Sequence, residues 1–525
     1  MANSADKIAA SIVEHDEETQ LPVKTNKQVD DAHCFVQEHG AIEWTEEEER
    51  KVLWKIDLRV IILLVIANVV TACDSGTYGI AAIFGMIQDL KLYTVKSIDP
   101  VVLDLTRYSW SNSILTFGLL AGQYPLLLLA QKVPIGKYMT GIILYTGALS
   151  LLFLTLDNFA GTMVLRFFYG FQGAGLPACV LLSSMWWKTE EQPLRIGLWM
   201  TGASIGAIVG QSLDYAAANI KGEFQKSPWK NMYLVLGSIT VAYSVFFGIF
   251  FPDTPMKARF LTERERNIAV RRLQKNQTGI QTRKFKPSQV WEAVTDPQLW
   301  LLCVTSFAFS FATAALGSFG AIVLEGFGFS SFKTVQLYMP ISGIVIILMP
   351  VSGFLANRFQ KSRIVIAMGF VMPSIIAYAL LWKLPRGNQG GLLASLYITV
   401  FFYGSLIQTL GLLASNIAGY TKKTTANSMI FMISAVGGIT GPFAFKGSEA
   451  SEGYPTGMII LMVTMAASEV SLMALLLYYK RFNRRRDLAQ DAPGAANALQ
   501  STLTKEQAAF LDLTDHENPY FRYSY

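Results

Sequence analysis

PDTPMKARFLTERERNIAVRRLQKNQTGIQTRKFKPSQVWEAVTDP, the stretch from Pro252 to Pro297, decides the fold of this chain. It carries ten Lys or Arg residues, and six long apolar runs lie on each side of it. An apolar run of about 20 residues is long enough to cross a hydrocarbon layer of ~30 Å as a helix. A basic segment between two blocks of six such runs predicts two membrane bundles that are joined on the cytoplasmic side.

The composition favours a membrane protein over a soluble one. Of the 525 residues, 52% are hydrophobic and 16% are charged, whereas soluble domains carry about 25% charged residues. The net charge of +6 comes from basic residues that flank the apolar runs, a pattern typical of cytoplasmic loops and not of nucleic-acid binding. We therefore expect a multispanning protein in contact with the lipid bilayer, with no nucleic acid as a partner.

Twelve spans are expected from the apolar runs. Those of the first half lie at about 60–83, 110–130, 138–156, 159–183, 195–217 and 232–251. Those of the second half lie at about 299–323, 335–357, 363–383, 391–415, 427–446 and 457–479. In span five, Gly202, Gly206 and Gly210 recur at every fourth position, which predicts a close contact with another helix.

Basic residues next to the spans predict where the ends of the chain lie. Four precede span one, ten lie in the central segment and five begin the C-terminal tail, so all three segments are expected in the cytoplasm. Thr45 opens a capping box for a short amphipathic helix. The predicted organisation is a disordered cytoplasmic tail (1–44), an N-terminal six-helix bundle with that lead-in helix (45–251), a cytoplasmic central loop (252–298), a C-terminal six-helix bundle (299–480) and a cytoplasmic tail (481–525).

The two halves of the chain share a short pattern at a constant offset of 226 residues. Residues 130–137, after span two, match residues 356–363, after span eight, in a small-polar-basic order that ends on a further basic residue. Each match follows a proline in the preceding span, at Pro125 and Pro350. The pattern indicates duplication of a half-length unit; the alternative, that basic residues merely cluster in cytoplasmic turns, explains only the charges.

Longer motifs carry a resemblance to a known family. They are Gly353–Arg363 (GFLANRFQKSR), Arg166–Gly170 (RFFYG), Trp187–Gln192 (WKTEEQ), Pro255–Thr262 (PMKARFLT), Gly419–Lys423 (GYTKK) and Asp512–Tyr523 (DLTDHENPYFRY). Through these motifs nearly the whole chain resembles the major facilitator superfamily and, within it, the allantoate-permease branch of the fungal anion:cation symporters.

The resemblance implies an all-α membrane fold with twelve transmembrane helices in two pseudo-symmetric six-helix bundles. It also implies a secondary transporter of the plasma membrane that takes up small organic anions, such as allantoate, ureidosuccinate, nicotinate or other vitamins, usually with protons. In such a transporter the two bundles rock about a midplane site, which opens alternately to either side. We expect this chain to act as a monomer.

Four charged side chains fall inside the predicted spans: Asp74, Arg166, Asp214 and Glu469. Each costs at least ~2.5–3.5 kcal/mol at membrane depth, so each is expected to have a partner or a function. Asp74 and Arg166 are expected about 9 and 10 Å from the outer edge, which would allow an ion pair between spans one and four. That pair is either a permanent clamp or a site where Asp74 exchanges its proton when an anionic substrate reaches Arg166, whose planar fork fits a carboxylate.

The other two acids and two substitutions bear on the mechanism. Asp214 is expected to reach water at the outer end of span five, and Glu469 to pair with another helix or to hold a proton without a coupling role. Ser75 stands where the family has a basic residue, and Gly173 stands where it has an acidic one. Proton coupling at Asp74 is therefore implied by the resemblance rather than by the neighbouring residues.

Neutral polar side chains complete the expected binding site. Tyr78 in span one, Gln172 in span four and Gln408 in span ten can donate to a carboxylate or ureido oxygen, and Asn416 can bind or gate at the inner end of span ten. For each of them a hydrogen bond between helices is the alternative. The sequence has no nucleotide-binding loop, zinc-ligand pattern or nucleophile elbow, so we expect no enzyme, no cofactor and no metal.

The sequence thus predicts proton-coupled import of a small organic anion by alternating access. Two alternatives stay open. Export of a secondary metabolite or drug is favoured by the lost charges and by the aromatic side chains of Tyr78 and Tyr124. A membrane receptor that binds a nutrient without moving it is the other alternative.

Overall fold

The computed structural model describes residues 44–98, 101–188, 191–221, 226–274, 286–359, 362–490, 513–518 and 520–525. Twelve helices in these ranges are long and apolar enough to cross a membrane, and each overlaps one of the twelve predicted spans. The predicted all-α membrane fold is therefore confirmed. The tail predicted for residues 1–44 lies outside the described residues, apart from Trp44.

The first six spans form the N-terminal bundle. Span one consists of α3 (Glu46–Ile56), a π-helical turn (Asp57–Ile61), α4 (Ile62–Ala81), a second π-helical turn (Ala82–Met86) and α5 (Ile87–Asp89). The other five are α6 (Thr106–Lys132), α7 (Ile135–Leu152), α8 with α9 (Phe159–Tyr169 and Gly175–Trp186), α10 (Gln192–Ala218) and α11 (Pro228–Phe250).

Local sequence signals explain how two of these helices form. α3 begins at the predicted capping box, in which the Thr45 hydroxyl accepts from the Glu48 amide and the Glu48 carboxylate accepts from the Thr45 amide. α10 packs closely along α4, as its glycines predict, because a Cβ atom on Gly202 would lie 2.6 Å from the Val65 carbonyl oxygen.

The second six spans form the C-terminal bundle. They are α14 (Pro297–Glu325), α15 (Ser331–Arg358), α16 (Arg363–Lys383), α17 with α18 (Gln389–Ile398 and Phe402–Asn416), α19 (Tyr420–Thr440) and α20 (Pro455–Gln490). The segment between the bundles contributes α12 (Glu263–Gln274) and α13 (Pro287–Thr295). We call the side of the molecule that carries α12 and α13 the inner face, because its basic residues predict a cytoplasmic location.

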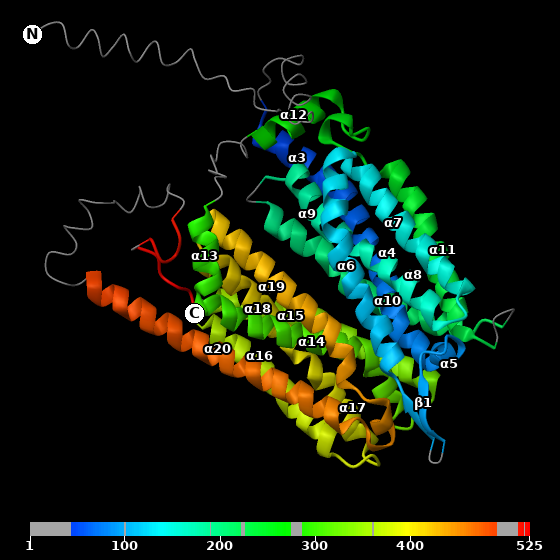
Figure 1. The fold of residues 1–525 in the computed structure, drawn as a ribbon. Coiled ribbons are helices and arrows are strands. Elements are labelled where there is room, and N and C mark those ends of the chain that lie inside the picture. Colours follow the sequence, from blue (N-terminus) through cyan, green and yellow to red (C-terminus); the bar gives the residue numbers. More distant parts are fainter. Residues whose placement is uncertain are drawn as a thin grey trace, which may run out of the picture.

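A short hairpin between spans one and two lies on the opposite, outer face (Figure 1). Its strands, β1 (Thr94–Ile98) and β2 (Val101–Asp104), pair antiparallel, with Val95 opposite Leu103 and a register shift before Ser97. β2 also contacts the loop before α20, where Gly447 lies against the Leu103 carbonyl group. The hairpin, which was not predicted, therefore connects the two bundles at the outer face.

The two bundles touch at their outer halves and diverge toward the inner face (Figure 1). In the described chain, the hydrogen bonds that join them all involve residues in the outer halves of the helices. They are Tyr108–Ser318, Ser109–Pro442, Ser113–Ile439, Gln211–Ser342 and Ser212–Met339. Aromatic pairs such as Phe84–Phe332 reinforce this contact. The molecule is therefore closed at the outer face and open toward the inner face.

Candidate functional site

A pocket of about 400 Å³ lies between the bundles, beneath the outer contacts. It is lined by α4 and α10 of the N-terminal bundle and by α14, α15 and α18 of the C-terminal bundle, and we call it the central pocket. Its polar lining residues are Ser204, Gln211, Thr313, Tyr338, Ser342 and Tyr403. None of the described residues that line it is charged, so it can receive the neutral part of a substrate.

A second pocket, of about 260 Å³, lies within the N-terminal bundle, and we call it the N-bundle pocket. The helices α4, α6, α7, α9 and α10 line it, and Asn68, Thr71 and Gln172 are its polar side chains. Ala203 of α10 lines both pockets, so they adjoin. Of the five predicted substrate-binding residues, Gln172 is the one that lines a described pocket.

Arg166 lies one helical turn outside the N-bundle pocket, on α8. Its Nε donates to the Ser111 carbonyl oxygen at 2.7 Å, and its Nη2 donates to Asn112 Oδ1 at 3.3 Å. The guanidinium carbon stands 3.6 Å from the centre of the Tyr78 ring, which is a cation–π contact. The predicted residues Arg166 and Tyr78 therefore lie together, and only 6% of the Arg166 side chain is exposed.

Asp74 does not pair with Arg166, so the predicted ion pair is wrong for this conformation. Tyr78, which contacts Arg166, lies four residues further toward the outer end of α4 than Asp74, about 6 Å along the axis. Asp74 instead accepts from the Thr240 hydroxyl of α11 at 2.9 Å, on the side of α4 that faces α11.

Asp214 does not reach water, contrary to the prediction, because its side chain is only 1% exposed. It lies between α10 and α4, where its Oδ1 accepts from the Thr77 hydroxyl at 3.1 Å. Its Oδ2 is buried without a hydrogen-bond partner, as is Oδ1 of Asp74. Two buried acids, each with neutral donors only, therefore lie in the core of the N-terminal bundle.

The remaining predicted polar residues lie outside both pockets. Gln408 donates to the carbonyl and hydroxyl oxygens of Ser352, so it joins α18 to α15 inside the C-terminal bundle. Asn416 pairs at the inner face with the backbone of Ser524, donating to its carbonyl oxygen at 2.7 Å and accepting from its amide at 2.8 Å. Glu469 on α20 is half-buried, and its Oε2 has no hydrogen-bond partner in the described chain.

The end of the chain docks on the inner face of the C-terminal bundle. The buried Lys422 ammonium lies 2.7 Å from Asp296, 2.7 Å from Asp515 and 2.9 Å from Glu292. Tyr523 donates its phenol hydrogen to Asp515 at 2.5 Å and stacks on Tyr479. Burial, with the Asp515 carboxylate beside it, raises the pKa of the Tyr523 phenol far above its usual range. The sequence motifs at Gly419–Lys423 and Asp512–Tyr523 thus contain the two halves of one ion cluster.

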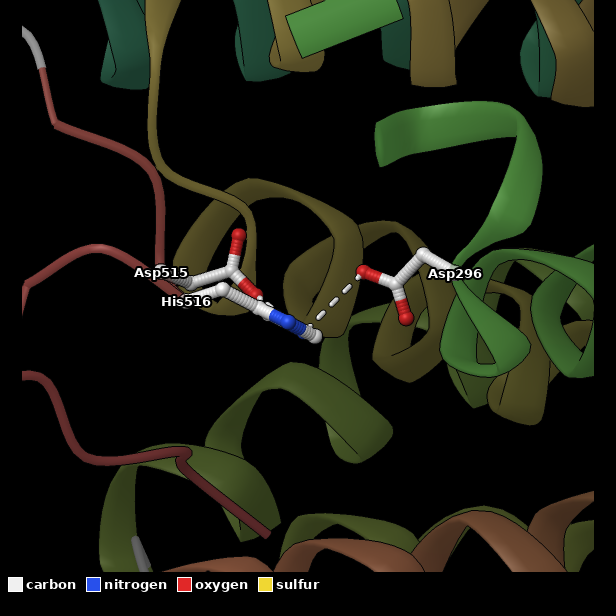
Figure 2. Close-up of side chains that lie close together, drawn as sticks. All are labelled: Asp296, Asp515 and His516. Atoms are coloured by element: carbon white, nitrogen blue, oxygen red, sulfur yellow. Dashed lines mark ion pairs between the residues drawn. The ribbon is translucent and has the colours of Figure 1, made fainter. Parts of the chain in front are cut away.

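His516 is the third side chain in this cluster that could bind a metal ion, beside Asp296 and Asp515 (Figure 2). Its Nε2 lies 3.6 Å from a carboxylate oxygen of Asp296 and 3.6 Å from one of Asp515. The Lys422 ammonium already stands between the same two carboxylates. This donor set fits an ion-pair cluster, in which Lys422 supplies the positive charge, better than a divalent cation.

An equivalent clamp holds the inner end of the N-terminal bundle. Arg195, at the start of α10, forms a two-pronged ion pair with Asp57, with N–O distances of 2.8 and 2.7 Å. Asp57 also accepts from the Trp187 indole at 2.7 Å. The Asp57–Arg195 pair joins spans one and five, just as Asp296–Lys422 joins the corresponding spans seven and eleven. Neither clamp was predicted, because the partners lie more than 100 residues apart.

Two pseudo-equivalent six-helix bundles, with a pocket between them that opens toward one face, are the architecture of a membrane carrier. The chain belongs to the Major Facilitator Superfamily, whose family model matches residues 64–442. It is a multi-pass membrane transporter and not an enzyme.

Known relatives confirm the resemblance seen in the sequence. An uncharacterized transporter of Schizosaccharomyces pombe is 35% identical over 97% of this chain and 92% of its own length. The allantoate permease of Saccharomyces cerevisiae is 28% identical over 96% of this chain and 91% of its own length.

A solved structure supports the fold. The chain is similar to a bacterial homolog of the human lysosomal transporter Spinster in an inward-facing, unoccupied conformation, with a TM-score of 0.63 and 11% identity. That similarity covers 83% of this chain and 99% of the bacterial one.

Proposed function

We propose that this transporter imports a small organic carboxylate together with protons across the plasma membrane, with both termini in the cytoplasm and as a monomer. The surroundings of Arg166 are the main reason for proposing an anionic substrate. Within the described chain, no carboxylate forms an ion pair with Arg166, although its side chain is almost fully buried among the spans. A buried cation that is held only by neutral groups is expected to have a charged partner during its working cycle.

The surroundings of Arg166 favour a substrate carboxylate as that partner. The described hydrogen bonds use Nε and Nη2, which leaves Nη1 for a further acceptor. One turn further in, Gly170 and Leu115 belong to the outer end of the N-bundle pocket. A carboxylate that fills this pocket from the inner face would meet the guanidinium, while its polar remainder would lie near Gln172 and Asn68.

We place the proton at Asp74. Asp74 is 3% exposed, has only the neutral hydroxyl groups of Thr240 and Ser150 as donors and forms no ion pair in the described chain. A charged carboxylate in that setting is costly, whereas a neutral acid is tolerated. Release of the proton in another conformation would couple proton movement to the movement of the bundles.

Uptake of labelled allantoate, ureidosuccinate and nicotinate into yeast cells that lack their own permeases tests this proposal. Loss of charge-assisted hydrogen bonds in Arg166→Gln is expected to lower uptake about 10- to 150-fold. Arg107→Gln is the matched control, because Arg107 is an exposed guanidinium at the outer end of α6 and should leave uptake unchanged. If Arg166→Gln leaves the uptake rate unchanged, the anion site is refuted. If neither Asp74→Asn nor external pH changes the uptake rate, the proton coupling is refuted.

Export of a neutral metabolite is the second candidate function. The uncharged central pocket, with the aromatic rings of Tyr338 and Tyr403, favours it. A strain that lacks the transporter would then be more sensitive to the metabolite, whereas loss of an importer would produce a growth defect on the nutrient.

A further inference from the structure

The N-terminal bundle contains two buried acids with closely similar surroundings. Asp74 is 3% exposed and Asp214 is 1% exposed. Each accepts a hydrogen bond from a threonine on a neighbouring helix, and the Ser150 hydroxyl of α7 also lies beside Asp74. Neither acid forms an ion pair with any cation in the described chain. Two charged carboxylates so placed would each lack compensation, so at least one must be neutral.

The Thr77 hydroxyl lies between Asp214 and the backbone of α4 next to Asp74. Its oxygen lies 3.1 Å from Oδ1 of Asp214 and 3.1 Å from the carbonyl oxygen of Cys73, the residue next to Asp74. A hydroxyl has one hydrogen to donate, so it cannot donate to both oxygens at once. When Asp214 is charged, Thr77 donates to the carboxylate. When Asp214 is protonated, the acid can donate to Thr77, and Thr77 then donates to Cys73.

Of the other titratable groups around the pair, Cys73 and Tyr78 on α4, Tyr169 on α8 and Tyr233 on α11 are neutral near pH 7. Arg166 on α8 is charged and stands over the Tyr78 ring, one turn from Asp74 along α4. α15, which also packs against α10, carries charges only at its two ends, at Lys333 and Arg358. The protonation of the pair therefore depends on burial, on the two acids themselves and on the charge of Arg166.

Asp214 lies next to the outer closure of the central pocket. Gln211, one turn earlier on α10, lines that pocket and donates to the Ser342 hydroxyl of the C-terminal bundle at 3.3 Å. Gly76 and Gly79, on either side of Thr77, also line the pocket. When the bundles separate at the outer face, these contacts must break, and a path from outer water to Asp214 opens.

We propose that Asp214 is a second proton site of the transport cycle, loaded from the outer face and close to Asp74, which lies one turn before Thr77 on α4. A hydronium ion gives its proton to Oδ2 of the charged carboxylate, which becomes a neutral acid and leaves water behind. The proposal rests on the function proposed above. Asp214 on α10 would then supply a carboxyl group to the N-terminal bundle, where Gly173 replaces the acidic residue that the family has in span four.

Infrared spectroscopy of the purified transporter tests this proposal without a substrate, because protonated carboxylic acids have their own carbonyl-stretch band. Titration between about pH 5 and pH 9 should show buried acids that change state, and Asp214→Asn should remove one component. Thr77→Val should shift that component, since the acid loses its hydroxyl partner, and Thr77→Ser should restore it. Glu469→Gln, at a carboxyl group of the other bundle, is the control and should leave this component in place.

Hydrogen–deuterium exchange at the same band distinguishes a proton site from a structural acid. A variant that favours the outward-facing state should expose Asp214 and speed its exchange in proportion to the population of that state, about 5- to 150-fold for a bias of 1–3 kcal/mol. A band that Asp214→Asn leaves intact, or a component that neither titrates nor exchanges faster, overturns the proposal. If the infrared results hold and no carboxylate is taken up, the proposed function fails and the second proton site stands.

Discussion

Substitution of Gly79 by Ala is expected to push the transporter from its inward-facing toward its outward-facing conformation. Gly79 on α4 faces Gly317 on α14 across the two bundles, at the outer closure. A Cβ atom on Gly79 would lie 2.5 Å from the Gly317 carbonyl oxygen, so the bundles must separate by several tenths of an ångström or more. Overpacking of this kind costs about 1–3 kcal/mol.

The overpacking at Gly79→Ala destabilises only the inward-facing conformation. When the outer halves separate, Gly79 and Gly317 part, and the added methyl group no longer meets the carbonyl oxygen. The whole 1–3 kcal/mol therefore shifts the equilibrium, which corresponds to roughly a 5- to 150-fold rise in the ratio of outward- to inward-facing molecules. Gly317→Ala is the matched control, because nothing lies within 4 Å of the Cβ position at Gly317.

Spin labels at the inner ends of the bundles measure this shift. Leu194 at the start of α10 and Phe359 after α15 are both exposed, with 68% and 53% of their side chains accessible. The distance distribution between labels at these positions should move toward shorter values in Gly79→Ala and stay as in the parent in Gly317→Ala. An unchanged distribution in Gly79→Ala would refute the view that this contact belongs to one of two alternating states.

Three further outcomes are expected in thermal unfolding experiments. Unfolding is detected by the labelling of the buried cysteines with a dye, in a Cys34→Ser background. Lys422→Met should lower the unfolding free energy by about 3–5 kcal/mol, since it leaves buried carboxylates without a cation, whereas the exposed neighbour Lys423→Met should have little effect. Tyr523→Phe should remove a pH dependence of the unfolding free energy. Because the pKa of this phenol is raised in the folded state, its contribution to stability is complete below about pH 10. Above that pH the contribution falls by about 1.4 kcal/mol per pH unit, until the folded pKa is reached. Gly202→Val should prevent the contact of α10 with α4, whereas Gly197→Ala, with open space at its Cβ position, should be tolerated.

The twelve spans could be predicted because the length of each apolar run can be read directly along the sequence. The ends of the spans were predicted less accurately. Span twelve was expected to end near residue 479 and continues to Gln490, and span one was expected to end near residue 83 and continues to Asp89. The helix bends there, with Phe84 outside helical geometry and Gly85 at a φ of 93°, and then resumes. Asp74 lies one turn further from the outer face than Tyr78, the α4 residue that contacts Arg166.

The partners of buried polar side chains could not be predicted from sequence, because they depend on the rotation of each helix about its axis. Asp74 faces Thr240 on α11, and Arg166 faces Tyr78 and Ser111, although all of these residues lie in neighbouring spans. Asn416 was expected to act in binding or gating, yet it pairs with Ser524, which lies 108 residues away in the chain. The family motif at the C-terminus was recognised, but its physical role became visible only once the tail was placed on α18 and α20.

The distribution of strong and weak contacts fits a molecule in which two rigid bundles rock against each other. Within each bundle, an ion pair joins the inner ends of two spans: the partly exposed Asp57–Arg195 pair in one and the buried Asp296–Lys422 pair in the other. Between the bundles, the described contacts are neutral hydrogen bonds and aromatic pairs, with no ion pair among them. Each neutral hydrogen bond contributes only about 0.5–1.5 kcal/mol net, and its groups regain water when the outer face opens. The interface can therefore open and close at modest cost, while the charged clamps would resist deformation inside either bundle.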